Sequence, residues 1–161
     1  MATMDRFKGI TAQIDGQIFK RGFWLYIWDI VCDERRVLYV GRTGDSSSNN
    51  AASPFSRFVQ HLNEKPNAKA NSMLRHLRNA GIKPTESRFE LFAVGPLFRE
   101  QEEQQKHIER RDKVAALECA LATYLRNAGY EVLGTHSSKK KLDMRLYRRL
   151  IASVQSRFPV Q

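Results

Sequence analysis

Two apolar runs rich in aromatic and β-branched residues dominate the segment 22–43. The polar stretch DERR at 33–36 separates them, as expected for a reversal between two antiparallel strands. We therefore expect a β-hairpin here. Residues 86–95 alternate apolar and polar positions before they turn apolar and reach Gly95-Pro96, which predicts a third strand that ends there. The short run 130–133 fits either an edge strand or an extended loop.

Helical spacing of apolar residues follows the hairpin. Ser53 before Pro54 is a typical helix start, because serine caps the first turn and proline is tolerated at its first position. A second helix is predicted over 72–80, with Asn71-Ser72 as its cap.

Two longer helical patterns follow, over 98–127 and over 141–158. The stretch 44–53 contains only small and polar side chains, which predicts a mobile surface loop.

The chain has 161 residues, of which 42% are hydrophobic and 27% charged, and this composition is that of one folded domain, 1–161. The predicted fold class is α+β, with a small, mainly antiparallel three-stranded sheet flanked by helices. No apolar run approaches the roughly 20 residues that span a bilayer, and the first residues lack a signal-peptide core. We expect a cytoplasmic protein without membrane association. The isolated cysteines Cys32 and Cys119 predict neither a disulfide nor a zinc site.

The net charge narrows the choice of partner. Lys and Arg outnumber Asp and Glu by 27 to 17, giving +10 and an isoelectric point near 9.9, which favours a polyanion such as nucleic acid. Seven basic residues and one acidic residue lie in 136–161, which predicts a basic C-terminal helix. Such a run is either a solvated face or a surface that contacts phosphates. The candidates for nucleic-acid contact in it are Lys139, Lys140, Lys141, Arg145, Arg148 and Arg149.

Two pairs of residues are candidates for chemistry. Tyr26 and Tyr39 are placed on one sheet face by a hairpin of odd register, so their hydroxyls either converge or end at the rim of the core. Arg57 and His61 lie one helical turn apart and outside the apolar stripe of their helix. They form either a solvated surface pair or a phosphate clamp beside a proton-transferring imidazole.

Glu118 is anomalous because it falls within the apolar stripe that includes Val114, Leu117 and Leu121. A carboxylate in that position needs an arginine partner, several hydrogen bonds or a metal ion. The pattern leaves a salt bridge and a metal site equally open. A single carboxylate ligand, completed by water and phosphate, suits Mg²⁺.

The order of these residues along the chain resembles that of the motifs in the GIY-YIG nuclease superfamily. The matching positions are WLY at 24–26, YVG at 39–41, Arg57, His61 and Glu118. The resemblance covers residues 22–133, with WLY as a degenerate GIY and YVG as YIG. His61 resembles the variant found in some restriction-enzyme members, where other branches have a tyrosine.

The resemblance implies a catalytic set of Tyr26, Tyr39, Arg57, His61 and Glu118. Glu118 would be the sole protein ligand of Mg²⁺ or Mn²⁺, and Arg42 the basic residue that follows YIG. The implied activity is endonucleolytic hydrolysis of phosphodiester bonds in DNA, with RNA an open alternative. Either Tyr26 or His61 would be the general base, and Tyr26 in that role needs cations that lower its pKa.

Two positions depart from the family pattern. Trp24 replaces the glycine of GIY, and YEV at 130–132 occupies the region where the family has an asparagine. The missing asparagine favours an alternative function, a catalytically silent nucleic-acid-binding module of the same fold. A second alternative is a scaffold whose basic tail binds an acidic protein. A nuclease this small would cut both strands either as a homodimer or by acting twice.

Overall fold

The computed structural model describes residues 7–46, 48–65 and 67–161. Residues 1–6, which belong to the expected domain, and residue 47 of the expected loop lie outside these ranges. The strands are β1 (Phe23–Cys32), β2 (Arg35–Arg42), β3 (Arg88–Phe98) and β4 (Val132–Leu133). The α-helices are α1 (Pro54–His61), α2 (Ser72–Asn79), α3 (Gln104–Asn127) and α4 (Met144–Val154), and two short 3-10 helices cover Gly16–Phe19 and Pro84–Glu86.

The α+β class is confirmed, but the described residues form a mixed sheet of four strands rather than three. Its order is β3-β1-β2-β4, with β4 parallel to β2 and the other pairs antiparallel. The fourth strand is the run that also fitted an extended loop. It is only two residues long and pairs with Leu38 and Tyr39 of β2, so sequence periodicity could not distinguish it from a loop.

Strand β3 is longer than predicted, because Gly95-Pro96 does not end it. Gly95 has a φ of +153°, and a Cβ at this position would lie 2.7 Å from the ring of Trp24. Glycine therefore allows β1 and β3 to approach closely here. After a shift in register, Phe98 pairs with Phe23. Because Phe98 belongs to the sheet, α3 begins at Gln104 and not at residue 98 as expected.

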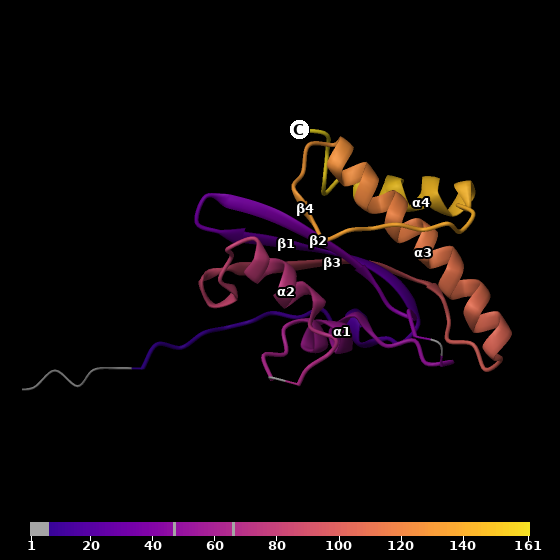
Figure 1. Ribbon diagram of the computed structural model, residues 1–161, viewed down its shortest axis with the longest axis horizontal. Coiled ribbons are helices and arrows are strands. Elements are labelled where there is room, and N and C mark those ends of the chain that lie inside the picture. Colours follow the sequence, from indigo (N-terminus) through magenta and orange to yellow (C-terminus); the bar gives the residue numbers. More distant parts are fainter. Residues whose placement is uncertain (1–6, 47, 66) are drawn as a thin grey trace, which may run out of the picture.

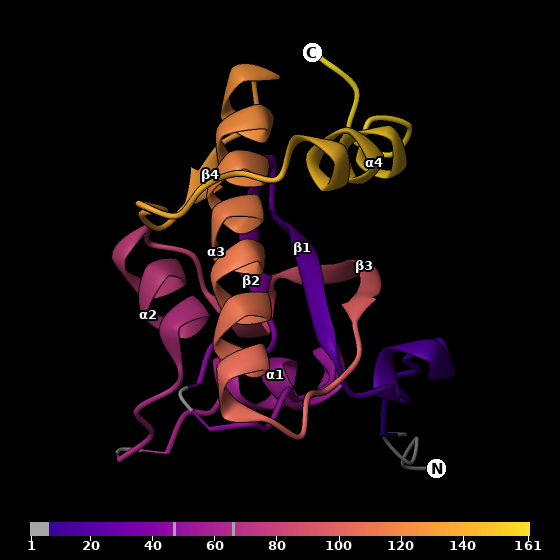
Figure 2. The same ribbon diagram turned by 90° about the vertical axis from the view of Figure 1, so that its right-hand side faces the viewer.

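The two faces of the sheet are covered by different helices (Figures 1 and 2). Leu25, Ile27 and Leu38 point from one face into a core that contains buried residues of α3 and α4. Tyr26 and Trp28 point from the other face, toward α2 and the end of α1. Alternation along β1 and β2 thus sends neighbouring residues into separate layers.

The helical part of the basic segment 136–161 is α4, which is shorter than the predicted 141–158. Asp143 caps it by accepting hydrogen bonds from the amides of Arg145 and Leu146. Residues 134–143 form a connection that crosses α3 before α4 begins (Figure 2). No helix among the described residues has the length and apolar character needed to span a membrane.

Candidate functional site

A pocket of about 290 Å³ opens beside the outer edge of β2. Strand β4 pairs with β2 only at Leu38 and Tyr39. Beyond them, the carbonyl oxygen of Val40 lies 3.1 Å from Nε2 of His136, which belongs to the connection after β4. Helix α2 contributes one wall, α3 another, and the connection after β4 the third. The lining includes Tyr39, Arg42, Ser72, His76, Glu118 and His136. Three of the residues singled out in the sequence, Tyr39, Arg42 and Glu118, therefore meet in one cavity.

Tyr26 lies behind this pocket rather than in it. Its partner across the hairpin is Gly41, and the same register places Trp28 opposite Tyr39, so both tyrosines share one sheet face as predicted. A Cβ at Gly41 would lie 2.5 Å from Cε2 of Tyr26. The glycine of YVG thus provides the space in which the Tyr26 ring lies over the neighbouring strand.

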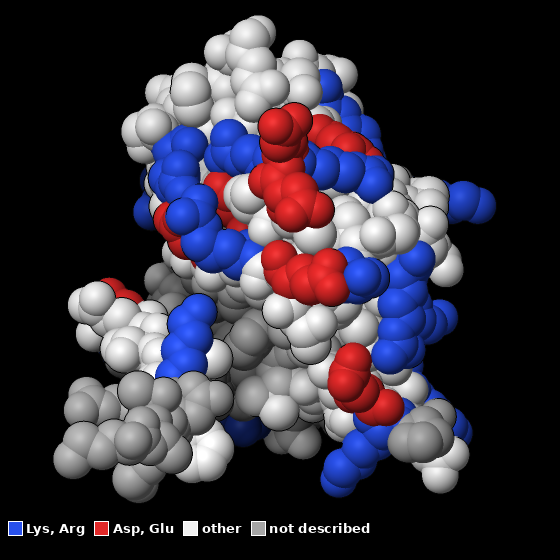
Figure 3. Space-filling model, turned by 90° about the vertical axis from the view of Figure 1, so that its left-hand side faces the viewer, with Lys and Arg blue, Asp and Glu red and all other residues white. Residues whose placement is uncertain are grey.

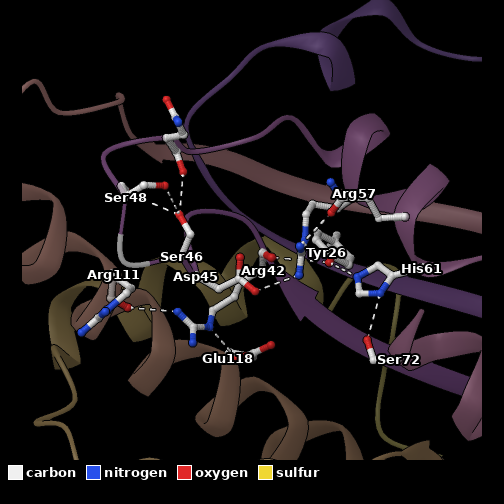
Figure 4. A network of polar contacts seen from close by, with 12 residues as sticks. Tyr26, Arg42, Asp45, Ser46, Ser48, Arg57, His61, Ser72, Arg111 and Glu118 are labelled. Carbon is white, nitrogen blue, oxygen red and sulfur yellow. Dashed lines mark hydrogen bonds and ion pairs between the residues drawn. The ribbon is translucent and has the colours of Figure 1, made fainter. Parts of the chain in front are cut away.

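His61 is the last residue of α1 and is only 2% exposed. It is therefore not part of a solvated surface pair with Arg57, and its imidazole is not free to titrate in water. Its Nε2 lies 2.7 Å from the Tyr26 hydroxyl, and its Nδ1 lies 3.0 Å from Oγ of Ser72. The Ser72 hydroxyl in turn lies 2.9 Å from the Tyr39 hydroxyl. A continuous chain of hydrogen bonds therefore joins the two tyrosines through His61 and Ser72, part of which is visible in Figure 4.

Burial determines the protonation states of His61 and of the two tyrosines in this chain of hydrogen bonds. It lowers the pKa of His61 to about 4, with the nearby Arg57 guanidinium acting in the same direction and Asp45 opposing them. The imidazole is therefore neutral at pH 7. Burial raises the pKa of Tyr26, more than the Arg57 guanidinium lowers it, and burial also raises the pKa of Tyr39. The lowered pKa that Tyr26 needs as a general base is thus not present in the free protein.

The Arg57 side chain extends from the same helix as His61, but it pairs with Asp45 rather than with a tyrosine. Its Nη2 donates to Oδ2 of Asp45 at 2.8 Å, and its Nη1 donates to Oε1 of Gln60. Its Nε is buried and forms no hydrogen bond with any described residue. The guanidinium also lies close enough to Tyr26 to influence the pKa of that phenol. Arg57 is thus both near the tyrosine and held by a carboxylate of the loop 44–53.

That loop is attached to the domain at several points. Besides the Asp45–Arg57 ion pair, the carbonyl of Ser46 lies 3.1 Å from Nε2 of His107. The amide of Ala51 donates to Glu100, whose carboxylate also pairs with Arg21. Figure 4 shows Asp45 between the guanidinium of Arg57 and the Arg42–Glu118 pair.

Glu118 forms an ion pair with Arg42, Nε to Oε2 at 2.8 Å, so the salt-bridge interpretation of its position holds in the structure. Burial raises the pKa of Glu118 while the Arg42 charge lowers it. Its second carboxylate oxygen has no hydrogen-bond partner among the described residues. In the ranges 7–46, 48–65 and 67–161, no three His, Cys, Asp or Glu side chains are grouped to hold a metal. A cation here would have Glu118 as its protein ligand and would share that carboxylate with Arg42.

The basic candidates in 136–161 are all exposed but fall into two groups. Lys139, Lys140 and Lys141 lie on the connection that continues from the pocket wall, and Lys140 pairs with Asp112 of α3. The second group, Arg145, Arg148 and Arg149, is on α4, which lies on the opposite side of α3 from α2 (Figure 2). The first group is therefore the nearer one along the chain to the pocket wall, which ends at Ser137, but Lys140 and Lys141 themselves lie against Asp112 and Lys113 of α3.

Elsewhere much of the positive charge is neutralised locally. At the end of the molecule with the β1–β2 turn, acidic and basic side chains alternate on the surface (Figure 3). The ion pairs in this region join Arg35 to Glu131, Arg36 to Asp29, and Arg157 to Glu90. The net charge of +10 thus overstates how much of this face is available to a polyanion.

Sequence reasoning missed several polar residues of the site. We assigned Ser72 only to a helix cap, but its hydroxyl bonds His61 and Tyr39 instead. Asp45 looked like an ordinary loop residue. The region expected to contain an asparagine provides Glu131, which pairs with Arg35. The pocket wall after β4 begins later, at Gly134, and includes Thr135 and His136. The sequence signal for this wall was the polar run THSS at 135–138, which follows Gly134.

Comparison with protein-family models, with curated proteins and with solved structures finds no match for this chain.

Proposed function

We propose that the chain is a divalent-metal-dependent endonuclease that hydrolyses phosphodiester bonds in DNA, of the kind implied by the resemblance to GIY-YIG nucleases. The observation that supports this most is convergence. Tyr39, Arg42 and Glu118, taken from separate motifs, line one pocket, and Tyr26 and His61 lie behind it. Arg57 lies beside Tyr26 and remains partly exposed.

The residues of the pocket fit a weakly held Mg²⁺ or Mn²⁺. Glu118 would hold it through the carboxylate oxygen that Arg42 leaves free, and water and a substrate phosphate would complete the shell. When bound, such an ion polarises the phosphate and neutralises the departing oxygen. Three or more protein ligands, which a zinc site needs, are not present among the described residues.

The remaining roles follow from charge and protonation. Arg57 and Arg42 can balance the negative charge that develops on phosphorus oxygens as the water attacks. His61 is a neutral imidazole at pH 7 and can accept a proton, whereas both phenols hold theirs more tightly than free tyrosine does. We therefore assign the general base to His61 and not to Tyr26. The Tyr26 hydroxyl orients the imidazole.

The test is cleavage of supercoiled plasmid by the purified protein with Mg²⁺, with EDTA and with Glu118→Ala. Glu109→Ala is the matched control, because Glu109 is exposed on the same helix and lines no part of the pocket. DNA binding is measured in parallel for each variant. Cleavage that stops with EDTA and with Glu118→Ala, but continues with Glu109→Ala, is the expected result.

The alternative is a catalytically silent module of the same fold that binds DNA or RNA. Two ion pairs favour this alternative, Arg42 with Glu118 and Arg57 with Asp45. They neutralise the carboxylate that would bind the metal and the guanidinium that would bind phosphate. Binding without cleavage over a range of metals, with linear and branched DNA and with RNA, would support it. Sedimentation with and without DNA tests whether two copies assemble to cut both strands.

A further inference from the structure

Ser72 is the first residue of α2, yet its hydroxyl does not cap the backbone amides of that helix. It lies 3.0 Å from Nδ1 of His61 and 2.9 Å from the Tyr39 hydroxyl, so it contacts one residue from α1 and one from β2. Asn71, at the N-cap position, makes no capping hydrogen bond with its side chain either. The start of α2 thus lacks the usual side-chain cap, and its serine is instead the link between His61 and Tyr39.

The two ends of this chain of hydrogen bonds differ in access. Tyr39 and Ser72 line the pocket, whereas Tyr26 is 2% exposed and is not part of the lining. A water or a phosphate in the pocket can therefore reach the Tyr39 end only. His61 lies between Ser72 and Tyr26, and its hydrogen bond to Ser72 is its connection to the pocket.

The hydrogen bonds of Tyr26 indicate the direction of the chain. Its hydroxyl can donate to the carbonyl oxygen of Arg42 at 3.4 Å, which leaves the phenolic oxygen free to accept from Nε2–H of His61. Nδ1 of the neutral imidazole then accepts from the Ser72 hydroxyl, and Oγ of Ser72 accepts from the Tyr39 hydroxyl. In this arrangement the outermost oxygen, that of Tyr39, keeps a lone pair for a water in the pocket.

We propose that Ser72 is a positioning residue that relays a proton from Tyr39, at the pocket, to Nδ1 of His61, and this rests on the nuclease function proposed above. As the attacking water forms its bond to phosphorus, it gives a proton to the Tyr39 oxygen. Tyr39 passes its phenolic proton to Ser72, and Ser72 passes its own to His61, which becomes imidazolium. The ester bond to the leaving oxygen breaks, and that alkoxide takes a proton from a water in the pocket. The hydroxide that this leaves receives the proton that the imidazolium returns through Ser72 and Tyr39.

Charged and titratable groups surround His61 on every side. They are Tyr26 from β1, Tyr39 from β2, Arg57 from α1 and Asp45 from the loop, with His76 of α2 beside Tyr39 and Glu118 of α3 close enough to act on both phenols. Arg57 opposes imidazolium formation in the free protein. A substrate phosphate bound at Arg57 and Arg42 brings negative charge that favours imidazolium, so the base strengthens when substrate is bound.

The first test compares Ser72→Ala with Ser72→Thr in single-turnover cleavage over a range of pH. Loss of the hydroxyl should lower the maximal rate about 100-fold with little change in DNA affinity, and should change the pH–rate profile. Threonine keeps a hydroxyl and should restore both the rate and the profile. Equal rates and profiles for wild type and Ser72→Ala would overturn the relay.

A second measurement does not depend on cleavage. Nitrogen chemical shifts of the His61 ring report which nitrogen bears the proton, and we expect the Nε2–H tautomer in the wild type and a mixture in Ser72→Ala. A wild-type protein with the Nδ1–H tautomer would overturn the proposed direction. If the wild type never cleaves, the nuclease function and the catalytic use of the relay both fail, and the ring shifts still decide whether Ser72 fixes the tautomer.

Discussion

The ring of Tyr26 lies over Gly41 on the neighbouring strand, so close that a Cβ at Gly41 would be 2.5 Å from Cε2 and 2.6 Å from the hydroxyl oxygen. The same hydroxyl lies 2.7 Å from His61, which is 35 residues away in sequence. The position of Tyr26, and through it the orientation of the imidazole, therefore depends on the absence of a side chain at Gly41. This gives a physical reason for a glycine in the YVG triplet.

Gly41→Ala should displace the Tyr26 ring, because neither the strand backbone nor the surrounding core has room for an added methyl group. We expect a loss of about 1–3 kcal/mol in the free energy of unfolding, the usual effect of overpacking. Urea unfolding measures it. Gly16→Ala is the control, since its Cβ would have its nearest neighbour at 3.9 Å. Equal stability of the two variants would show that the ring adjusts without strain.

The sequence predicted those parts of the fold that depend on local signals. The hairpin, the start of α1 and the α+β class all follow from alternation, turn residues and caps. The errors have a common cause, which is tertiary contact. Strand β3 continues through Gly95-Pro96 because Trp24 packs against the glycine, and β4 exists only because two residues pair with β2.

Within the site, the predicted residues were those that carry a pattern. Glu118 interrupts an apolar stripe, and Arg57 and His61 lie one turn apart, so both could be found from spacing. Ser72 and Asp45 break no pattern, because a serine at a helix start and an aspartate in a loop are ordinary in those positions. Their importance comes from partners 11 and 12 residues away, His61 and Arg57, which only the folded chain brings into contact.

The lowered pKa of His61 makes folding stability depend on pH. The value in the folded protein is about 4, against an ordinary 6.5, so the unfolded chain binds more protons between these two values. Stability should therefore fall as the pH decreases from 6.5 to 4 and level off below. The contribution is on the order of 3 kcal/mol.

Urea unfolding of wild type and His61→Gln at pH 7, 5 and 4 measures the difference. His136, whose pKa burial also lowers, is present in both proteins. Parallel pH curves would contradict this prediction.

Arg42 and a divalent cation should compete for the carboxylate of Glu118. In Arg42→Gln the carboxylate loses its partner, so we expect lower stability without metal and a larger rise in melting temperature with millimolar Mg²⁺ than the wild type shows. Thermal unfolding with EDTA and with Mg²⁺ measures both effects. Arg35→Gln removes an exposed arginine from a surface ion pair and is the control. If Mg²⁺ shifts both variants equally, the metal does not bind at Glu118.

Asp45 occupies the guanidinium that we assign to a substrate phosphate. The Asp45 Oδ2 to Arg57 Nη2 distance is 2.8 Å, and the loop that carries Asp45 is also tied to His107 through Ser46. A phosphate that binds Arg57 must displace this carboxylate or share the guanidinium with it. If Arg57 binds a substrate phosphate as proposed, the loop opposes that binding in the free protein by like charge and by occupancy.

Asp45→Asn should consequently bind DNA more tightly, by about 5- to 30-fold at low salt, which corresponds to about 1–2 kcal/mol. One additional phosphate contact should steepen the slope of log K against log salt by about 0.9, because one more counterion is released. Fluorescence anisotropy with a labelled duplex over a range of salt measures both quantities. Asp33→Asn is the charge-matched control, because Asp33 has a φ of +52° in the exposed β1–β2 turn, a conformation that asparagine also tolerates. If Asp33→Asn raises the affinity and the slope equally, net charge alone is responsible, and Arg57 is not a phosphate-binding residue.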